Sequence, residues 1–333
     1  MDFRFSGLQT SLRHAQRTCL DGAHPPARLR RLDHADGREE GIWQALAILG
    51  VHALLVPETA GGLGLTLVEG AIIAEEFGRA NVGELLADTC LVAVPWLARH
   101  GDTGALADIA AGTRRIALTH PINPWIVDLD QADAVLTAAG LVPPPPATTH
   151  LESVDPLRRL FAPMPDAGTD DLLLNLAALM AAAQMLGATE RMLSMAADYA
   201  KTRKQFGQPI GSFQAVKHLL ANVAVRLEFA RPVVWRAAYA LHHGHPHAPT
   251  HVSHAKLAAT DAAMLAAETA IQVHGAMGYT YEVDLHYWMK RTWALAGAWG
   301  DQSFHQQRVD QAIIGGLMPI GPGTTFSSED QHA

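Results

Sequence analysis

The segment DLLLNLAALMAAAQMLGATERMLSMAADYAKTR, residues 171–203, decides the fold class of this chain. It is rich in alanine and leucine and predicts a long helix, since roughly 30 uninterrupted helical residues span about 45 Å at 1.5 Å per residue. Its most apolar part begins at Leu172 and is interrupted by Asn175 and Gln184. These features favour the buried core helix of a globular protein over a membrane span.

Two further long helices are expected near Phe213 to His242 and near His254 to His274. Together with the first helix they make residues 171–320 a C-terminal helical bundle, with a tail at 321–333.

The N-terminal part, residues 1–113, is also dominated by apolar residues three and four apart, as in IWQALAILGVHALLV (42–56) and LVEGAIIAEEFGRA (67–80). We expect an N-terminal helical domain here. The intervening PETAGGLGL (57–65) contains three glycines, but they follow no clear strand and do not match GxGxxG. A connection between helices is therefore favoured over a phosphate-binding turn.

Residues 114–170 differ in residue pattern from both helical parts. Short β-like runs, RIALT (115–119) and AVLTAA (134–139), alternate with turn-rich polar stretches, and the proline tract 143–146 forces extended backbone. We interpret this part as a small β module or linker. The predicted fold class is mainly α with a small β segment.

Composition limits the kinds of function. The chain has 333 residues, 49% of them apolar, and a formal net charge of -8 with no block of lysine and arginine, so nothing predicts nucleic-acid binding. The N-terminus lacks a positively charged start followed by an apolar core, so we expect no secretory signal. Two isolated cysteines, Cys19 and Cys90, favour a reducing cytoplasm.

The stretch LHHGHPHAPTHVSH (241–254) is rich in histidine and raises the question of a metal site. No carboxylate or thiolate is interleaved, and Pro246 and Pro249 disrupt regular ligand spacing. We expect a polar loop between two helices rather than a functional metal site.

The sequence YAKTRKQFGQPIGSFQAVKH (199–218) ends one helix, turns, and starts another near Ser212. Such a turn exposes Arg203, Gln205 and Phe206 beside a helix start, where free backbone donors favour an anion. Arginine can bind a phosphate through two parallel hydrogen bonds, and phenylalanine can cover a flat ring. The alternative is a basic helix end that only compensates the helix dipole.

A second stretch, AIQVHGAMGYTYEVDLHYWMKR (270–291), runs from a helix into Gly275 and Gly278. These small residues let the backbone approach a neighbour closely, and Gln272 lies near that approach. The alternative is a glycine C-cap followed by a packed aromatic segment.

Together these two stretches, with GVHALLVPETAGGLGLTLVEGAIIAEEFGR (50–79), resemble the acyl-CoA dehydrogenase family. The resemblance implies an N-terminal helical domain, a middle β domain and a C-terminal four-helix bundle that hold FAD. It also implies a glutamate base that removes the α-proton of an acyl-CoA thioester while the β-hydrogen leaves as hydride to the flavin.

By this resemblance, one group of residues matches the segment that reaches across a dimer interface to the partner's FAD: Arg203, Gln205, Phe206, Phe213 and Gln214. Gln272 and Gly275 match the segment that holds the pyrophosphate and adenosine side of that FAD. Ala276 replaces a glycine common in the family, which puts the contact at that position in doubt.

The departures from the family pattern concern the chain's own active site. The β part is shorter than the family's, and only Thr119, His120 and Pro121 remain as a trace of the flavin-facing pattern. Gly300 stands where most members carry the catalytic glutamate, and Ala177 stands near the position of an alternative base on the first bundle helix. Asp301 is the nearest carboxylate, but neighbouring side chains of a helix point about 100° apart. Glu282 matches a different family glutamate, for which a structural role is expected.

The residues that serve a partner's FAD are kept, whereas those that serve this chain's own flavin and substrate are lost. This division resembles the short, non-catalytic subunit of α2β2 heterotetrameric dehydrogenases of steroid side-chain degradation. The implied partners are a full-length subunit with the catalytic glutamate, an acyl-CoA substrate and electron-transfer flavoprotein. Two alternatives stay open at this point: a self-sufficient flavoenzyme that uses Asp301 or another base, and a flavin-free binding or regulatory protein.

Overall fold

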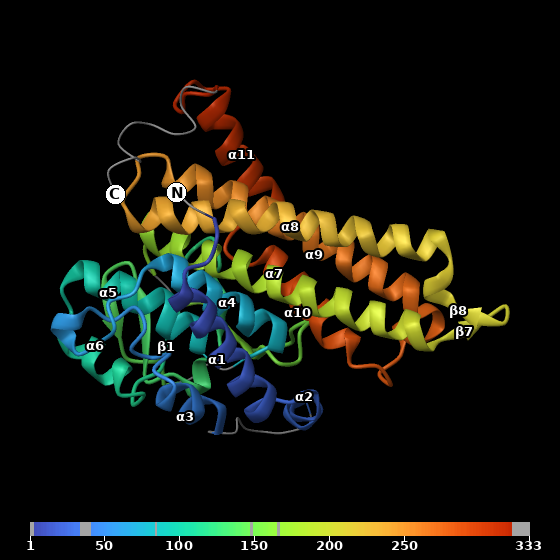
Figure 1. Cartoon of the computed structure of the whole chain (residues 1–333). Coiled ribbons are helices and arrows are strands. Elements are labelled where there is room, and N and C mark those ends of the chain that lie inside the picture. Colours follow the sequence, from blue (N-terminus) through green and yellow to red (C-terminus); the bar gives the residue numbers. More distant parts are fainter. Residues whose placement is uncertain (1–2, 34–40, 84, 147–148, 165–166, 322–333) are drawn as a thin grey trace.

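The computed structural model describes residues 3–33, 41–83, 85–146, 149–164 and 167–321. Long helices of the C-terminal part lie side by side across the molecule, the N-terminal helices pack beneath them, and short strands lie beside the N-terminal helices (Figure 1). The fold is mainly α with few short strands, as the sequence predicted. The expected tail at 321–333 lies outside the described residues apart from Gly321.

The N-terminal part is helical, and capping residues fix where its main helices begin. Ser6 and Thr66 each form a capping box, with Gln9 and Glu69 respectively. Its helices are α1 (Gly7–Ala23), α2 (Pro26–Asp33), α3 (Gly41–Ile48), α4 (Leu67–Ala80), the π-helical η2 (Ala87–Ala93), α5 (Val94–His100) and α6 (Thr103–Ala110).

The helical pattern noted at 42–56 is confirmed only for its first half. Helix α3 ends at Ile48 because Gly50 adopts φ +87° and its amide bonds back to Ala47 O. The apolar residues that follow form buried turns and not helix. The short helix η1 (Glu58–Ala60) then leads into the connection to α4.

The middle part forms two small three-stranded sheets within the described residues. Strand β1 (Ile116–Leu118) pairs in parallel with β3 (Ala134–Thr137), which pairs antiparallel with β4 (Gly140–Val142). Strand β6 (Leu160–Phe161) pairs antiparallel with both β2 (Ile126–Val127) and β5 (His150–Leu151). The predicted strands in RIALT and AVLTAA are thus confirmed as β1 and β3.

The C-terminal part is the predicted bundle. It contains α7 (Asp171–Thr202), α8 (Gln214–His242), α9 (Ala248–His274), α10 (Leu285–Gly297) and α11 (Gln302–Ile313). Helix α7 is long and apolar enough to cross a membrane, but 89% of its most apolar window is buried inside the protein. Its interpretation as a core helix is therefore confirmed.

Helix α9 begins six residues before the expected start at His254. Pro249 lies in the first turn, where the missing N–H has no helical acceptor to lose, so it starts the helix instead of interrupting it. His251 and His254 are consequently helical residues, and the histidine-rich loop is confined to the residues between α8 and α9.

Helices α4 and α7 join the N-terminal part to the bundle through backbone contact. A Cβ on Gly78 would lie 1.8 Å from Gln184 O, and a Cβ on Gly187 would lie 1.7 Å from Glu75 O. Only glycine permits this approach. One hydrophobic cluster consequently runs through both parts.

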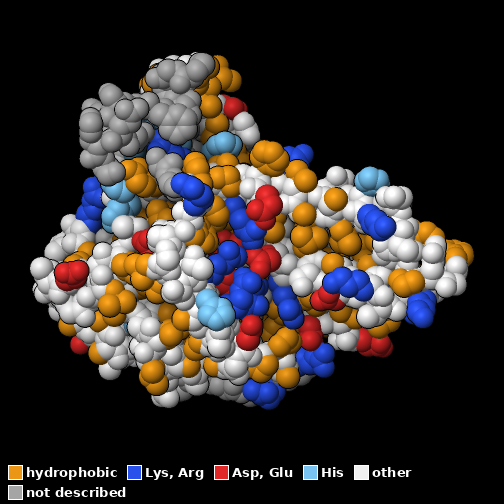
Figure 2. Space-filling view, viewed as in Figure 1, with side chains coloured by type: hydrophobic (Ala, Val, Ile, Leu, Met, Phe, Trp, Pro, Cys, Tyr) orange, Lys and Arg blue, Asp and Glu red, His pale blue; other side chains and the backbone are white. Residues whose placement is uncertain are grey.

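A network of ion pairs holds α1 against the place where α4 and α7 are in contact. Figure 2 shows acidic and basic side chains gathered in the middle of the face that α1 and α4 form. Arg17 Nη2 lies 2.6 Å from Glu76 Oε1 and Arg13 Nη2 lies 3.2 Å from Glu75 Oε1. Burial would raise the pKa of Glu76, but hydrogen bonds from Arg17, Arg13 and Arg79 outweigh it and lower that pKa.

Candidate functional site

The predicted ligand-binding turn is a hairpin that projects from one end of the bundle (Figure 1). Strand β7 (Lys204–Gln205) pairs antiparallel with β8 (Gln208–Pro209). Phe206 and Gly207 connect them with φ angles of 52° and 82°, the left-handed pair that a tight two-residue hairpin requires. Phe206 is held at the tip and is 91% exposed.

Arg203 and Phe213 flank this hairpin. Arg203 ends α7, its amide bonds to Tyr199 O, and its exposed side chain has no ion pair with the described carboxylates. Phe213 immediately precedes α8, and its ring packs edge to face against Phe206 at 6.2 Å between centroids. The exposed Gln205 and Gln214 add amide groups to the same surface.

The second predicted group lies at the same end of the bundle. The rings of Tyr199 on α7 and His274 on α9 stack at 4.4 Å between centroids, which brings the ends of these two helices together. Gln272 is exposed in the last turn of α9, and Gly275 follows with φ +59° and open space around its Cβ position. The structure therefore gathers the two sequence motifs on one exposed surface, which we call the hairpin end.

The hairpin end fits the outer part of a dinucleotide cofactor. Arg203 can bind a phosphate, the glutamine amides can donate and accept hydrogen bonds, and Phe206 presents an apolar face to a flat ring. These side chains are exposed, so they cover a cofactor from one side but do not enclose it. Their role in cofactor binding stays a prediction.

The second predicted feature, the position of the catalytic base, lies in the turn between α10 and α11. We expected Gly300 and Asp301 to be adjacent residues of a helix, and this is wrong. Gly300 has φ +95°, a left-handed conformation that favours glycine. A Cβ there would lie 2.4 Å from Phe304 Cδ1 and 2.8 Å from His305 Nε2. The turn therefore has no room for a glutamate side chain at position 300.

A buried lysine holds this turn. Lys256 of α9 donates from Nζ to Ala296 O at 3.1 Å, to Ala298 O at 2.9 Å and to Gly300 O at 3.0 Å. Burial lowers the pKa of Lys256 to about 7. His305 Nε2 hydrogen-bonds to Trp299 O at 3.0 Å. The side chains of Lys256 and His305 therefore both hydrogen-bond to the backbone of the turn.

Asp301 caps helix α11. Its side chain accepts from the amide of Phe304 at 2.8 Å, the usual role of aspartate at an N-cap. The residue is exposed to solvent and does not line the cavity beside this turn. This geometry suits helix capping and not proton abstraction, which requires the base within about 3 Å of its substrate.

One of the two base positions considered in the sequence, and the residue before the other, border the same small cavity. Ala177 of α7 and Trp299, next to Gly300, line a space of about 50 Å³. Asp88 and Arg158 also line it. Burial raises the pKa of Asp88 to about 6, although the charge of Arg158 opposes this shift. A space of this size holds one or two waters but not a thioester with its acyl chain.

Two of the three residues that remain from the family's flavin-facing pattern are buried within this chain. Thr119 and His120 are 1% and 3% exposed. His120 Nδ1 accepts from the amide of Ile122 at 3.1 Å, and its Nε2 lies 3.4 Å from Asp170 N. The side-chain oxygen of Asn123 accepts from Trp299 N at 3.3 Å and ties this segment to the α10–α11 turn. These residues do not fit a flavin ring bound by this chain alone.

Lys256 and Asn123 are the site residues that sequence reasoning missed. A single lysine among the alanines of 255–267 was a possible signal for a buried cation, whereas nothing in the sequence indicated the contact of Asn123 with Trp299. Glu282, for which a structural role was expected, has an exposed side chain. Within the described residues, no group of three or more His, Cys, Asp or Glu side chains could hold a metal ion.

Comparisons with known proteins agree with this architecture. Residues 8–105 match the family profile "Acyl-CoA dehydrogenase, N-terminal domain", and residues 171–313 match "Acyl-CoA dehydrogenase, C-terminal domain". The chain is 38% identical to acyl-CoA dehydrogenase IpdE2 of Mycobacterium tuberculosis over 286 residues, which cover 80% of this chain and 85% of that protein. It is 32% identical to IpdE2 of Mycolicibacterium smegmatis, with 88% and 94% covered.

A solved structure shows the same fold over almost the whole length. A chain of the ChsE4-ChsE5 complex from Mycobacterium tuberculosis superposes with a TM-score of 0.82 at 25% identity, covering 96% of this chain and 100% of that chain. The present chain belongs to the acyl-CoA dehydrogenase family.

Proposed function

We propose that this chain is the non-catalytic subunit of a heteromeric FAD-dependent acyl-CoA dehydrogenase. The observation that carries the proposal is the turn at Gly300, where φ +95° and the contacts of Phe304 and His305 leave no room for the family's glutamate. A catalytic carboxylate must then come from a second kind of subunit. The solved ChsE4-ChsE5 complex is a relative that contains two different chains.

The chain's contribution to the complex would be the hairpin end. Arg203, Phe206 and Gln272 are exposed there and would complete the FAD site of the partner subunit, together with Phe213 and Gln214. When bound, FAD would accept the hydride from the β-carbon of the substrate. This chain's groups would hold the phosphate and adenosine side of the cofactor by charge, hydrogen bonds and ring contact.

The complex would dehydrogenate an acyl-CoA thioester between the α- and β-carbons, and we propose a steroid side-chain thioester as substrate. Support for this substrate comes from the resemblance to heterotetrameric steroid dehydrogenases. Electron-transfer flavoprotein would reoxidise the cofactor, and the complex would work in the cytoplasm.

Expression of the chain alone and together with a full-length, glutamate-bearing family member encoded beside it tests this proposal. The chain alone should bind little flavin and oxidise no acyl-CoA, and the joint preparation should be a yellow, active complex. A second arm uses Arg203→Gln in the complex, which should release FAD more readily, with Arg114→Gln as a matched control away from the hairpin end. A yellow and active homo-oligomer of this chain would refute the proposal.

A further inference from the structure

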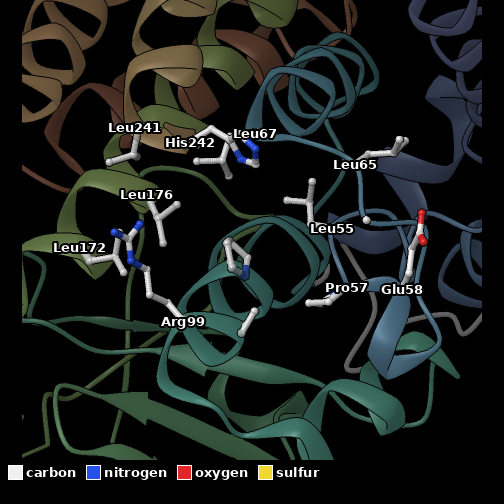
Figure 3. A pocket seen from close by; sticks show the side chains of 13 residues that line it. Leu55, Pro57, Glu58, Leu65, Leu67, Arg99, Leu172, Leu176, Leu241 and His242 are labelled. Atoms are coloured by element: carbon white, nitrogen blue, oxygen red, sulfur yellow. The ribbon is translucent and has the colours of Figure 1, made fainter. Parts of the chain in front are cut away.

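A second cavity, of about 480 Å³, lies where the N-terminal part meets the start of α7 and the end of α8. Figure 3 shows leucine side chains from these elements directed toward its centre. Leu55 and Leu67 come from the N-terminal part, and Leu172 and Leu176 come from the first turns of α7. The lining is mostly apolar, and the volume is within the roughly 300–1,000 Å³ of small-molecule sites.

This cavity is separate from the small one beside the α10–α11 turn. The two share no lining residue, and the larger one does not reach Ala177 or Trp299. Neither base position faces it. A molecule held there would therefore not lie against the groups that the family uses for dehydrogenation.

Polar side chains lie at opposite ends of this mostly apolar cavity. Arg99 of α5 and His242 of α8 lie at one end, and Glu58 lies at the other (Figure 3). Arg99 is exposed and pairs with no carboxylate of the described residues. Burial lowers the pKa of His242, and the charges of His243 and Arg99 lower it further, against the opposing charge of Glu69. This shift favours the neutral form of His242, and Arg99 is the cation that an entering anion meets.

We propose that this cavity binds an apolar monocarboxylic acid, with the carboxylate at Arg99 and the hydrocarbon part against the leucines. The guanidinium can form two parallel hydrogen bonds with a carboxylate. Burial of the hydrocarbon part away from water adds a hydrophobic contribution to the binding free energy. The site is independent of the flavin and of the proposed partner, so its test can fail without affecting the proposed function.

Isothermal titration of the full chain, in the assembly in which it purifies, with dodecanoate and with dodecan-1-ol tests the proposal. The acid should bind more tightly than the alcohol. Arg99→Gln should weaken dodecanoate binding about tenfold and leave binding of the alcohol unchanged, since only the acid loses charge-assisted hydrogen bonds.

A pair of tryptophan variants locates the binding. Leu65 lines the cavity and Leu63 does not, although both belong to the same connection and Leu63 is 49% exposed. Leu65→Trp should abolish binding of both probes, whereas Leu63→Trp should bind like the wild type. The proposal is overturned if the wild type fails to bind dodecanoate, if acid and alcohol bind equally, or if Leu65→Trp binds normally.

Discussion

Ala177 and Trp299 line the same cavity, although 122 positions separate them (299 − 177). The first lies near the predicted position of an alternative base, and the second precedes Gly300, the predicted position of the usual base. A carboxylate at position 177 would therefore lie beside the α10–α11 turn, whereas a side chain at position 300 would meet Phe304 and His305. The shared cavity is a space of about 50 Å³ bordered by Asp88 and Arg158, which is too small for a substrate.

Restoring the glutamate at position 300 should not restore activity. Gly300→Glu places Cβ against Phe304 and His305 and forces a left-handed backbone on a residue with a side chain, so we expect a loss of about 2–4 kcal/mol in the free energy of unfolding. The exposed Gly297 has nothing within 4 Å of its Cβ position, so Gly297→Glu is the matched control and should fold normally. Urea unfolding measures both. A stable Gly300→Glu chain with acyl-CoA oxidation would show that the turn tolerates a base.

Asp301 should matter for stability and not for chemistry. Asp301→Ala removes the cap of α11 and should lower the free energy of unfolding by about 1 kcal/mol, whereas Asp301→Asn keeps an N-cap residue and should be close to neutral. Neither variant should change the turnover of the assembled complex. A loss of turnover of about 10²- to 10⁴-fold in Asp301→Asn would instead identify a general base.

The hairpin tip should contribute to assembly. Phe206 is 91% exposed, so Phe206→Ala should leave the unfolding free energy unchanged within about 0.5 kcal/mol. It should weaken association with the partner subunit by about 2 kcal/mol, the usual loss for a central aromatic contact. Ile48→Ala, at an equally exposed residue of α3, should change neither quantity. Analytical ultracentrifugation at several concentrations detects the difference, and equal association of the two variants would argue against an interface at the hairpin.

Lys256 should make stability depend on pH. Burial lowers its pKa from 10.5 to about 7 in the folded protein, so between these values the unfolded chain binds a proton that the folded chain does not. Stability should therefore rise from pH 7 toward pH 10, by an amount on the order of 1–4 kcal/mol. Lys256→Met should lose this rise, and the exposed Lys201→Met should keep it. The same slope in Lys256→Met and wild type would remove Lys256 as its cause.

Much of the helical architecture could be predicted from apolar periodicity. Helix α7 begins at Asp171, where the pattern begins, and α8 begins one residue after the predicted start at Phe213. The errors occur where a single residue has two possible roles. Pro249 breaks a helix interior but starts a helix at its first turn, and Gly50 can lie within a helix or end one.

The sequence proposes the residues of the candidate site but not their geometry. The motif residues of the hairpin end could be named from the sequence, whereas the stacking of Tyr199 on His274 that brings the motifs together could not. Likewise, the sequence shows a glycine at position 300, where the resemblance predicts a carboxylate in most family members. That the turn is left-handed and held by Lys256, 44 residues earlier, depends on tertiary packing.

The flavin content of the native complex distinguishes a non-catalytic subunit from a self-sufficient flavoenzyme. The purified assembly of this chain with its full-length partner should be analysed for FAD by absorbance after denaturation and for each polypeptide by quantitative amino-acid analysis. We expect one FAD for each pair of unlike chains. One FAD for every polypeptide, including this one, would contradict it.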